Sequence, residues 1–234
     1  MEIAGKLAVV TGVSKGIGLA TVEALLDKEA IVVGWGRTAP DLQHANFYFI
    51  ECDVRYNESV QRAFDQTLFK AGTHISILVN NAGLGIGANL EEQSIDDWHT
   101  MFDTNVNGLF YCTRLVLPGM KEQEEGHIIN ISSIAGTTGI EGMSGYCGTK
   151  HAVRGISQAL YKEVRNYGVK VTCIYPGSVN TNFFDNFENI TARENMMRPE
   201  DIASTILHAL ESHPNYHHVD IEVRPLMPKG KISK

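Results

Sequence analysis

Residues 7–18 read LAVVTGVSKGIG, and this stretch decides the fold. The apolar run LAVV has the composition of a buried strand, and Gly12, Gly16 and Gly18 follow it in a turn that leads into a helical pattern. Glycines in such a turn let backbone N–H groups approach a pyrophosphate, and a helix N-terminus favours negative charge. The spacing therefore predicts a dinucleotide cradle, with a plain strand-to-helix turn as the simpler alternative.

Short apolar runs alternate with longer amphipathic segments along the rest of the chain. The predicted strands are LAVV, AIVV, FYFI, ISILV, HIINI, VKVTCI and DIEV, and the predicted helices lie near residues 17–29, 57–70, 95–117, 146–166 and 199–212. Strands that alternate with helices indicate βαβ units with right-handed crossovers. We expect one α/β domain over residues 1–234, a doubly wound, Rossmann-like sheet of about seven parallel strands with helices on both faces. The link TAPDLQHAN is too short for a full helical crossover.

Composition narrows the function classes. The formal charge is −7, and the absence of a basic block argues against a nucleic-acid partner. No apolar stretch reaches the ~18 residues that a membrane helix needs, and MEIAGKLAVVTG enters the first strand without room for a signal peptide. We expect no metal, because the nine histidines form no H-E-x-x-H pattern. Scattered cysteines without a C-x-x-C pair favour free thiols in a cytoplasmic protein, and they are Cys52, Cys112, Cys147 and Cys173.

A possible proton-transfer group lies in the segment SSIAGTTGIEGMSGYCGTK. Tyr146 and Lys150 are four residues apart, which places their side chains on one face of a helix. An ammonium beside a phenol stabilises the phenolate, so the pKa of Tyr146 should fall from about 10. Ser133 ends the preceding apolar run and could hydrogen-bond the same oxygen that Tyr146 serves. Alone, a Tyr-x-x-x-Lys pair occurs in many helices by chance, so its meaning depends on the glycine-rich turn.

In order and approximate spacing, these motifs resemble the short-chain dehydrogenase/reductase family over nearly the whole chain. The resemblance implies hydride transfer between a nicotinamide and a carbonyl or alcohol substrate. Within the family the sequence is most similar in general to 3-oxoacyl-carrier-protein reductases and small carbonyl reductases. The motifs that carry the resemblance are TGVSKGIG, NNAG at residues 80–83, Asn105, Ser133, Tyr146, Lys150 and PGSVNT at residues 176–181.

The resemblance implies a catalytic role for four residues. Tyr146 would exchange a proton with the substrate oxygen, Ser133 would orient that oxygen, and Lys150 would hold the ribose hydroxyls of the cofactor. Asn105 would support a water that leads protons toward Lys150. The alternative for Asn105 is a purely structural hydrogen bond inside its helical segment, MFDTNVNGLF.

The second strand ends without the acidic residue that NAD-preferring members place there. Gly36 stands at that position, Arg37 follows it, and Lys15 lies inside the glycine-rich turn. Two cations beside the adenosine ribose would suit a 2′-phosphate through charge-assisted hydrogen bonds. The sequence therefore favours NADP(H) over NAD(H), with solvated surface cations as the alternative.

Further cofactor contacts follow from the resemblance. Asp53 would meet the adenine amino group, although a turn acid ahead of Asn57 is the alternative, and Val179 and Thr181 would meet the nicotinamide carboxamide. Asn80 is expected to hold the central sheet instead. The complete predicted cofactor set is Gly12, Ser14, Lys15, Gly16, Ile17, Gly18, Arg37, Asp53, Val54, Asn81, Ala82, Gly83, Tyr146, Lys150, Pro176, Gly177, Val179 and Thr181.

Residues 182–198 fit no clean periodicity and are predicted to form the substrate lid. Apolar side chains would give the lid its inner face or would pack on the domain instead, and they are Phe183, Phe184, Phe187, Met196 and Met197. Three acids against two arginines weaken the carrier-protein interpretation, because carrier proteins are acidic; these charges are Asp185, Glu188, Glu194, Arg193 and Arg198. A small, apolar or modestly polar carbonyl compound fits at least as well.

Two further possibilities concern function class and assembly. Some chains of this fold bind a dinucleotide and act as regulators without turnover, typically after losing the tyrosine or the lysine, both of which are present here. The helical segments 95–117 and 146–166 carry apolar residues beyond the needs of one sheet face, and the corresponding family helices pair across a dimer axis. We expect a homotetramer or homodimer.

Overall fold

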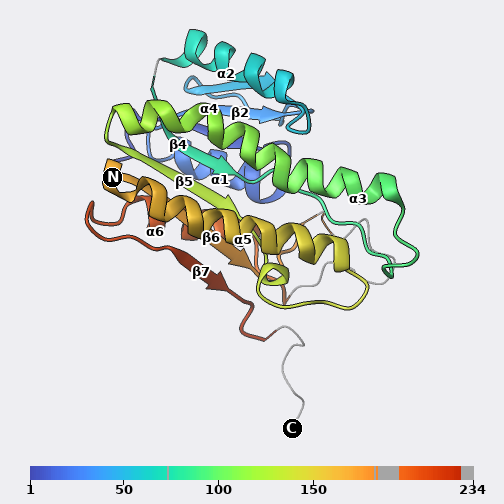
Figure 1. Cartoon of the computed structure of the whole chain (residues 1–234). Coiled ribbons are helices and arrows are strands. Elements are labelled where there is room, and N and C mark those ends of the chain that lie inside the picture. Colours follow the sequence, from blue (N-terminus) through green and yellow to red (C-terminus); the bar gives the residue numbers. More distant parts are fainter. Residues whose placement is uncertain (73, 182, 184–194, 228–234) are drawn as a thin grey trace.

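All seven predicted apolar runs become strands of one parallel sheet. The computed structural model describes residues 1–72, 74–181, 183 and 195–227 (Figure 1). The strand order is β3-β2-β1-β4-β5-β6-β7, which is the doubly wound, Rossmann-like arrangement. The strands are β1 Leu7–Thr11, β2 Ile31–Gly36, β3 Phe47–Glu51, β4 Ile75–Asn80, β5 Gly126–Ile131, β6 Val169–Pro176 and β7 Asp220–Val223.

Helices cover both faces of the sheet. One layer contains α1 and α6, which pack against each other, and the other contains α2, α4 and α5 (Figure 1). No helix among the described residues has the length and apolar character needed to cross a membrane. The α-helices are α1 Gly16–Leu26, α2 Asn57–Ala71, α3 Ile95–Phe102, α4 Gly108–Glu122, α5 Ser144–Val164 and α6 Pro199–Leu210.

Successive residues of the central strands bury alternate faces of the sheet. In β1, Ala8 and Val10 pack in the core beneath α1 and α6, whereas Leu7 and Val9 pack in the core beneath α2, α4 and α5. This double burial explains why the strand runs read as continuously apolar and not as alternating. Burial of each large aliphatic side chain contributes about 1.5–3 kcal/mol, so both cores hold the sheet firmly. All four cysteines are free and buried.

Two segments differ from a regular βαβ unit. Residues 37–46 join β2 to β3 without a helix, as the short link predicts, and β3 is a partly exposed edge strand. The predicted helix 95–117 is not continuous: α3 ends at Phe102, a π-helical turn occupies Asp103–Asn107, and α4 then runs to Glu122. The apolar periodicity continues through the turn, which is why the sequence pattern does not reveal it.

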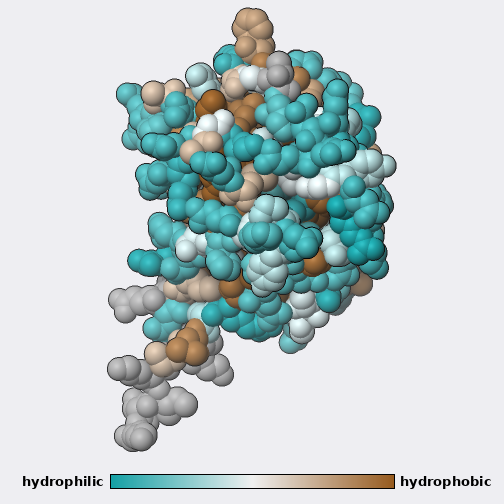
Figure 2. All heavy atoms as spheres, turned by 90° about the vertical axis from the view of Figure 1, so that its left-hand side faces the viewer, coloured by the Kyte–Doolittle hydropathy of each residue, from teal (hydrophilic) through white to brown (hydrophobic). Residues whose placement is uncertain are grey.

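The chain reverses its winding direction between β1 and β4. From β1 it proceeds outward to β2 and β3, and from β4 outward to β5, β6 and β7. A crevice forms at the carboxyl ends of the strands at such a switch point, which is where ligands bind in this class of sheet. The opposite edge, near the amino ends of the strands, is largely hydrophilic with separated apolar side chains (Figure 2).

Three histidines, His127, His217 and His218, lie close together at that opposite edge. The Thr172 hydroxyl donates to the His218 carbonyl at 2.6 Å, so it accepts from His127 Nε2–H at 2.8 Å. His127 Nδ1 is then a bare acceptor, and it is buried without a hydrogen-bond partner among the described residues. His217 Nε2 accepts the Val171 N–H. Burial lowers the pKa of His127 well below its ordinary value, and it also lowers the pKa of His217 and His218.

Because these pKa values are depressed in the folded protein, acid should destabilise it. Above about pH 6.5 neither the folded nor the unfolded chain protonates these rings, so their neutral burial carries no penalty. As the pH falls below that value, these histidines bind protons in the unfolded chain but not in the folded protein. We expect the free energy of unfolding to fall by about 1.4 kcal/mol per pH unit from His127 alone. Urea denaturation over this pH range measures the slope.

His127→Asn keeps a donor toward Thr172 but does not titrate, so its slope should be shallower than that of the wild type by about one proton. His99→Gln, which replaces an exposed histidine of α3, is the matched control and should keep the wild-type slope. Equal slopes for His127→Asn and the wild type would contradict the assignment.

Candidate active site

The glycine-rich turn between β1 and α1 has the geometry of an anion cradle. Gly12 and Gly16 have positive φ angles of 73° and 62°, which favour glycine. A Cβ on Gly18 would lie 2.2 Å from the Gly12 carbonyl oxygen, so this glycine permits the turn to pack on the helix. The first turn of α1 contains no acidic residue, and the side chain of its N-cap residue, Lys15, makes no capping hydrogen bond. The N–H groups of this helix start are therefore suited to a pyrophosphate.

Asn81 fixes the turn to the neighbouring strand. Its side-chain amide donates to the carbonyl oxygens of Thr11 and Gly12 at 3.0 and 3.1 Å. The Thr11 hydroxyl oxygen accepts the N–H groups of Asn81 and Ala82 at 3.0 and 2.9 Å. A Cβ on Gly12 would lie 2.9 Å from Ala82 Cα, so the backbones after β1 and β4 are in direct contact.

Asn80 faces the sheet interior, as predicted. Its amide donates to Thr113 of α4 at 3.1 Å and to Asn130 of β5 at 2.9 Å. Asn130 in turn donates to Ser157 of α5 at 2.9 Å. This buried chain of side chains ties α4 and α5 to the sheet beneath the site.

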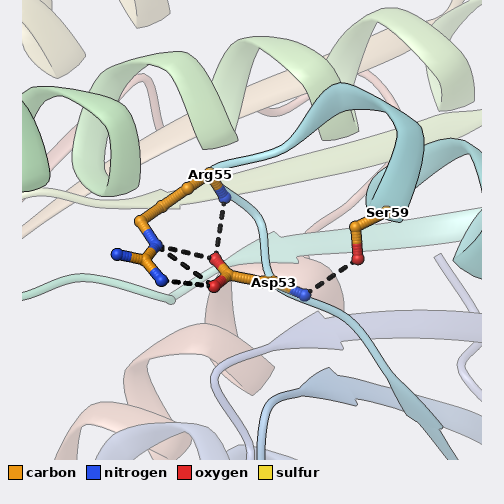
Figure 3. A network of polar contacts seen from close by, with 3 residues as sticks. All are labelled: Asp53, Arg55 and Ser59. Carbon is orange, nitrogen blue, oxygen red and sulfur yellow. Dashed lines mark hydrogen bonds and ion pairs between the residues drawn. The ribbon is translucent and has the colours of Figure 1, made fainter.

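Asp53 after β3 is engaged by Arg55 (Figure 3). The Arg55 Nε donates to both carboxylate oxygens at 3.0 and 3.1 Å, Nη2 donates at 2.6 Å, and the Arg55 backbone N–H adds a bond of 3.1 Å. These hydrogen bonds lower the pKa of Asp53 below its usual value. The geometry favours the turn-acid interpretation of Asp53, because Arg55 already uses both oxygens; its contact with adenine stays a prediction.

Ser133 and Tyr146 meet at the carboxyl end of β5. Ser133 precedes a short 3-10 turn, Ile134–Gly136, and its hydroxyl oxygen accepts the Ala135 N–H at 3.1 Å. Tyr146 lies in the first turns of α5 and is 6% exposed. Burial raises the pKa of the Tyr146 phenol, and the side-chain hydrogen bond with Ser133 offsets this only in part.

Lys150 lies one turn further along α5 and is also buried. Its Nζ donates to the Ile131 carbonyl at 2.9 Å and lies 5.7 Å from the centre of the Tyr146 ring. Burial lowers the pKa of Lys150 to about 8. The expected lowering of the Tyr146 pKa by Lys150 is therefore wrong for the protein alone, because burial disfavours the phenolate and the ammonium is directed to the Ile131 carbonyl.

Asn105 occupies the π-helical turn and is 3% exposed. Its amide donates to the Leu84 carbonyl at 2.8 Å and to the Thr149 hydroxyl at 2.9 Å, and its oxygen accepts the Leu84 N–H at 2.9 Å. Both amide hydrogens are thus used, which favours the structural alternative for this side chain. A π-turn often marks a functional position, and here it aims Asn105 at the loop after β4.

The loop after β6 closes the other side of the site. The Gly177 N–H donates to Val223 of β7 at 2.8 Å, and a Cβ on Gly16 would lie 3.3 Å from Thr181 Cγ2. Thr181 therefore sits against the glycine-rich turn. Beyond it, residues 182 and 184–194 of the predicted lid lie outside the described residues. Of its described apolar residues, Phe183 contacts the Tyr146 ring at 5.3 Å between centroids, whereas Met197 packs against the domain core.

One cavity of about 610 Å³ unites these positions. Every predicted site residue lines it except Gly18 and Asn105, which support it from behind. Sequence reasoning missed several lining residues, and for all of them except Thr104, which lies in the π-helical turn, the one available signal was their place after a strand or before α5. These residues are Thr38, Arg55, Leu84, Thr104, Ile134, Ile140 and Met143.

The glycine turn, its open helix start and the cavity fit a nicotinamide dinucleotide. For a metal the residues do not fit, since the described part of the chain contains no group of three or more His, Cys, Asp or Glu side chains that could bind one.

Comparisons with known proteins agree with this geometry. The model of the short chain dehydrogenase family matches residues 6–191. An uncharacterized oxidoreductase of Staphylococcus saprophyticus is 35% identical over 236 residues, covering 97% of this chain and 100% of that protein. The closed form of a serine dehydrogenase complexed with NADP+ is 30% identical with a TM-score of 0.84, over 97% of this chain and 98% of that one. An alcohol dehydrogenase from Thermococcus sibiricus, complexed with 5-hydroxy-NADP, is 25% identical with a TM-score of 0.86, over 97% and 99%. A family match of this extent, on a site built in this way, shows that the chain belongs to the short-chain dehydrogenase/reductase family of oxidoreductases.

Proposed function

We propose that this protein is an NADP(H)-dependent oxidoreductase that interconverts a carbonyl compound and an alcohol, with Tyr146 as general acid and base. The observation that carries the proposal is a single cavity with two different ends. Ser133, Tyr146 and Lys150 line one end, and Lys15 and Arg37 line the other, across the glycine-rich turn.

The hydroxyls of Tyr146 and Ser133 would act on the substrate oxygen. When bound, the reduced nicotinamide supplies the hydride that reaches the carbonyl carbon and is itself oxidised. Tyr146 donates its phenolic proton to the oxygen, so that C=O becomes CH–OH, while Ser133 hydrogen-bonds the same oxygen. The raised pKa of Tyr146 keeps the phenol protonated and therefore ready to donate. In alcohol oxidation Tyr146 accepts the proton instead.

Lys150 would bind the cofactor ribose. An ammonium has three N–H donors, and the Ile131 carbonyl accepts one of them at 2.9 Å. The other two are suited to the ribose hydroxyls. A cation held there also favours the phenolate that Tyr146 becomes after it donates.

Lys15 and Arg37 support the preference for NADP(H). Lys15 precedes α1, Arg37 follows β2 directly, and both line the cavity. The positive charge of Arg37 acts at the adenosine end of the cavity: after the larger effect of the Arg55 hydrogen bonds, it also helps to lower the pKa of Asp53. Two solved relatives bind NADP or a derivative of it, which agrees with this assignment.

The four free, buried thiols support a reducing compartment, and we propose the cytoplasm.

Residues 182–198 remain our proposal for the substrate lid. Backbone hydrogen bonds between Asn180 and Met197 and between Met197 and Ser178, at 2.8 and 3.1 Å, join the two stems of that segment.

Tyr146→Phe should remove nearly all turnover while leaving cofactor binding intact. The change deletes only the hydroxyl, and loss of a general acid costs about 10²–10⁴-fold in rate. NADPH oxidation with a panel of ketones and aldehydes measures turnover, and fluorescence titration measures NADPH binding. Tyr167→Phe makes the same change at an exposed position and is the control. Retained activity in Tyr146→Phe would refute the mechanism.

Arg37→Asp should shift the cofactor preference toward NADH. An aspartate repels the 2′-phosphate and can accept from ribose hydroxyls, so the NADPH-to-NADH ratio of kcat/KM should fall by about 10–100-fold. Lys70→Asp reverses the charge of an exposed side chain in the last turn of α2, outside the cavity lining, and should leave the ratio unchanged. Comparable kcat/KM values for NADPH and NADH in the wild type would contradict the NADP(H) assignment.

We also propose that the protein is a homodimer or homotetramer joined through α4 and α5. Phe110 of α4 is 52% exposed, and the exposed face of α5 carries small residues one turn apart at Gly155 and Ala159. Such a face allows close approach of a second helix pair.

Light scattering at micromolar concentration should therefore show an oligomer. Gly155→Arg should shift the population toward smaller species, because the long side chain would occupy the proposed helix contact. Phe69→Asp changes a side chain of α2 that is 91% exposed and serves as the control. A monomeric wild type would contradict the proposal.

A further inference from the structure

We propose that the substrate end of the cavity selects uncharged carbonyl compounds that carry an apolar group beside the carbonyl carbon. This inference rests on the proposed function and narrows it to a substrate class. It follows from which described side chains surround the two hydroxyls that would hold the substrate oxygen, and from where the charges of the cavity lie.

Apolar side chains surround the position that Ser133 and Tyr146 assign to the substrate oxygen. They come from three separate segments: the loop after β4, the segment between β5 and α5, and the residues beyond β6. The apolar residues that line the cavity here are Leu84, Ile134, Ile140, Met143 and Phe183. Each methylene that such a wall takes from water contributes favourably to binding.

The wall is fixed by specific contacts. The Ala88 N–H donates to the Gly142 carbonyl at 2.9 Å, which ties the loop after β4 to the segment that precedes α5. Phe183 lies over Gly85, where an added Cβ would come within 2.6 Å of the ring. The same ring packs on Tyr146 at 5.3 Å between centroids. The phenol that would act on the substrate is thus flanked by an aromatic surface.

The charged side chains of the cavity lie elsewhere. Among the described residues, those that line it are Lys15, Arg37, Asp53, Arg55 and Lys150. The first four follow β1, β2 and β3 on the adenosine side, and Lys150 is directed to the Ile131 carbonyl. Within the described part of the chain, the substrate end therefore offers no cation to a carboxylate. The proposed lid carries two arginines, Arg193 and Arg198, against three acids, Asp185, Glu188 and Glu194, so by sequence it adds no net positive charge. Burial of an unpaired charge is costly, so an anionic substrate should be rejected.

A pair of substrates with the same reacting group tests the selection. Ethyl acetoacetate and acetoacetate both present a 3-oxo group, but only the second is an anion. With the wild-type enzyme and NADPH, kcat/KM for the ester should exceed that for the anion by at least about 100-fold. In a series of 2-alkanones, kcat/KM should rise by about fourfold for each added methylene until the wall is covered. L-Serine with NADP+ should not be oxidised, because its carboxylate would meet the same apolar wall.

Ile140→Lys places a cation in the wall at a partly exposed position and should raise the acetoacetate-to-ester ratio of kcat/KM at least about tenfold. Thr138→Lys adds the same charge two residues away, outside the cavity lining, and should leave the ratio unchanged. Equal use of acetoacetate and its ester by the wild type, or no gain along the alkanone series, overturns the substrate class alone. Tight NADPH binding without turnover of any of these compounds overturns the proposed function as well.

Discussion

The site depends on the contact between the turns that follow β1 and β4. At this switch point Asn81 donates to the backbone of Thr11 and Gly12, and Thr11 accepts from the backbone of Asn81 and Ala82. The two halves of the sheet wind in opposite directions from this place. Direct pairing of β1 with β4 aligns the strands as far as Val10 and Val79, and the side-chain bonds extend this alignment into the turns beyond. Four hydrogen bonds therefore fix the anion cradle relative to the end of β4, the strand that lies between β1 and β5.

The buried polar chain beneath the site has a related role. Asn80, Asn130 and Ser157 connect β4, β5 and α5 through hydrogen bonds of 2.9 Å each. Ser132 adds a bond of 3.0 Å to the Lys150 carbonyl, which fixes the first turns of α5 against the end of β5. Polar groups buried in this way are costly unless they are paired, and pairing in one arrangement orients α5 and hence Tyr146.

Sequence alone predicted the fold because its main signals are local. Strands buried on both faces need continuous apolar runs, and the glycine positions follow from backbone geometry that only glycine adopts without strain. The π-turn at Asp103–Asn107 was not predictable, since it changes hydrogen bonding without changing the apolar pattern. The substrate wall also escaped prediction, because it depends on how loops from different strands meet. The Asp53–Arg55 pairing is local, but a spacing of two residues does not by itself indicate a side-chain contact.

Electrostatics in the catalytic pair shows why sequence spacing was insufficient. The four-residue spacing of Tyr146 and Lys150 places them on one helix face, yet burial acts on both side chains, raising the pKa of the phenol and lowering that of the ammonium to about 8. Each group is thereby pushed toward its neutral form, and Lys150 donates to the Ile131 carbonyl while its Nζ lies 5.7 Å from the centre of the Tyr146 ring. The spacing therefore sets the distance between the two groups, whereas the surrounding interior sets their charge. These buried surroundings favour the protonated phenol of Tyr146, which is the form that can donate a proton. The phenolate becomes favourable only as the proton moves to the substrate oxygen.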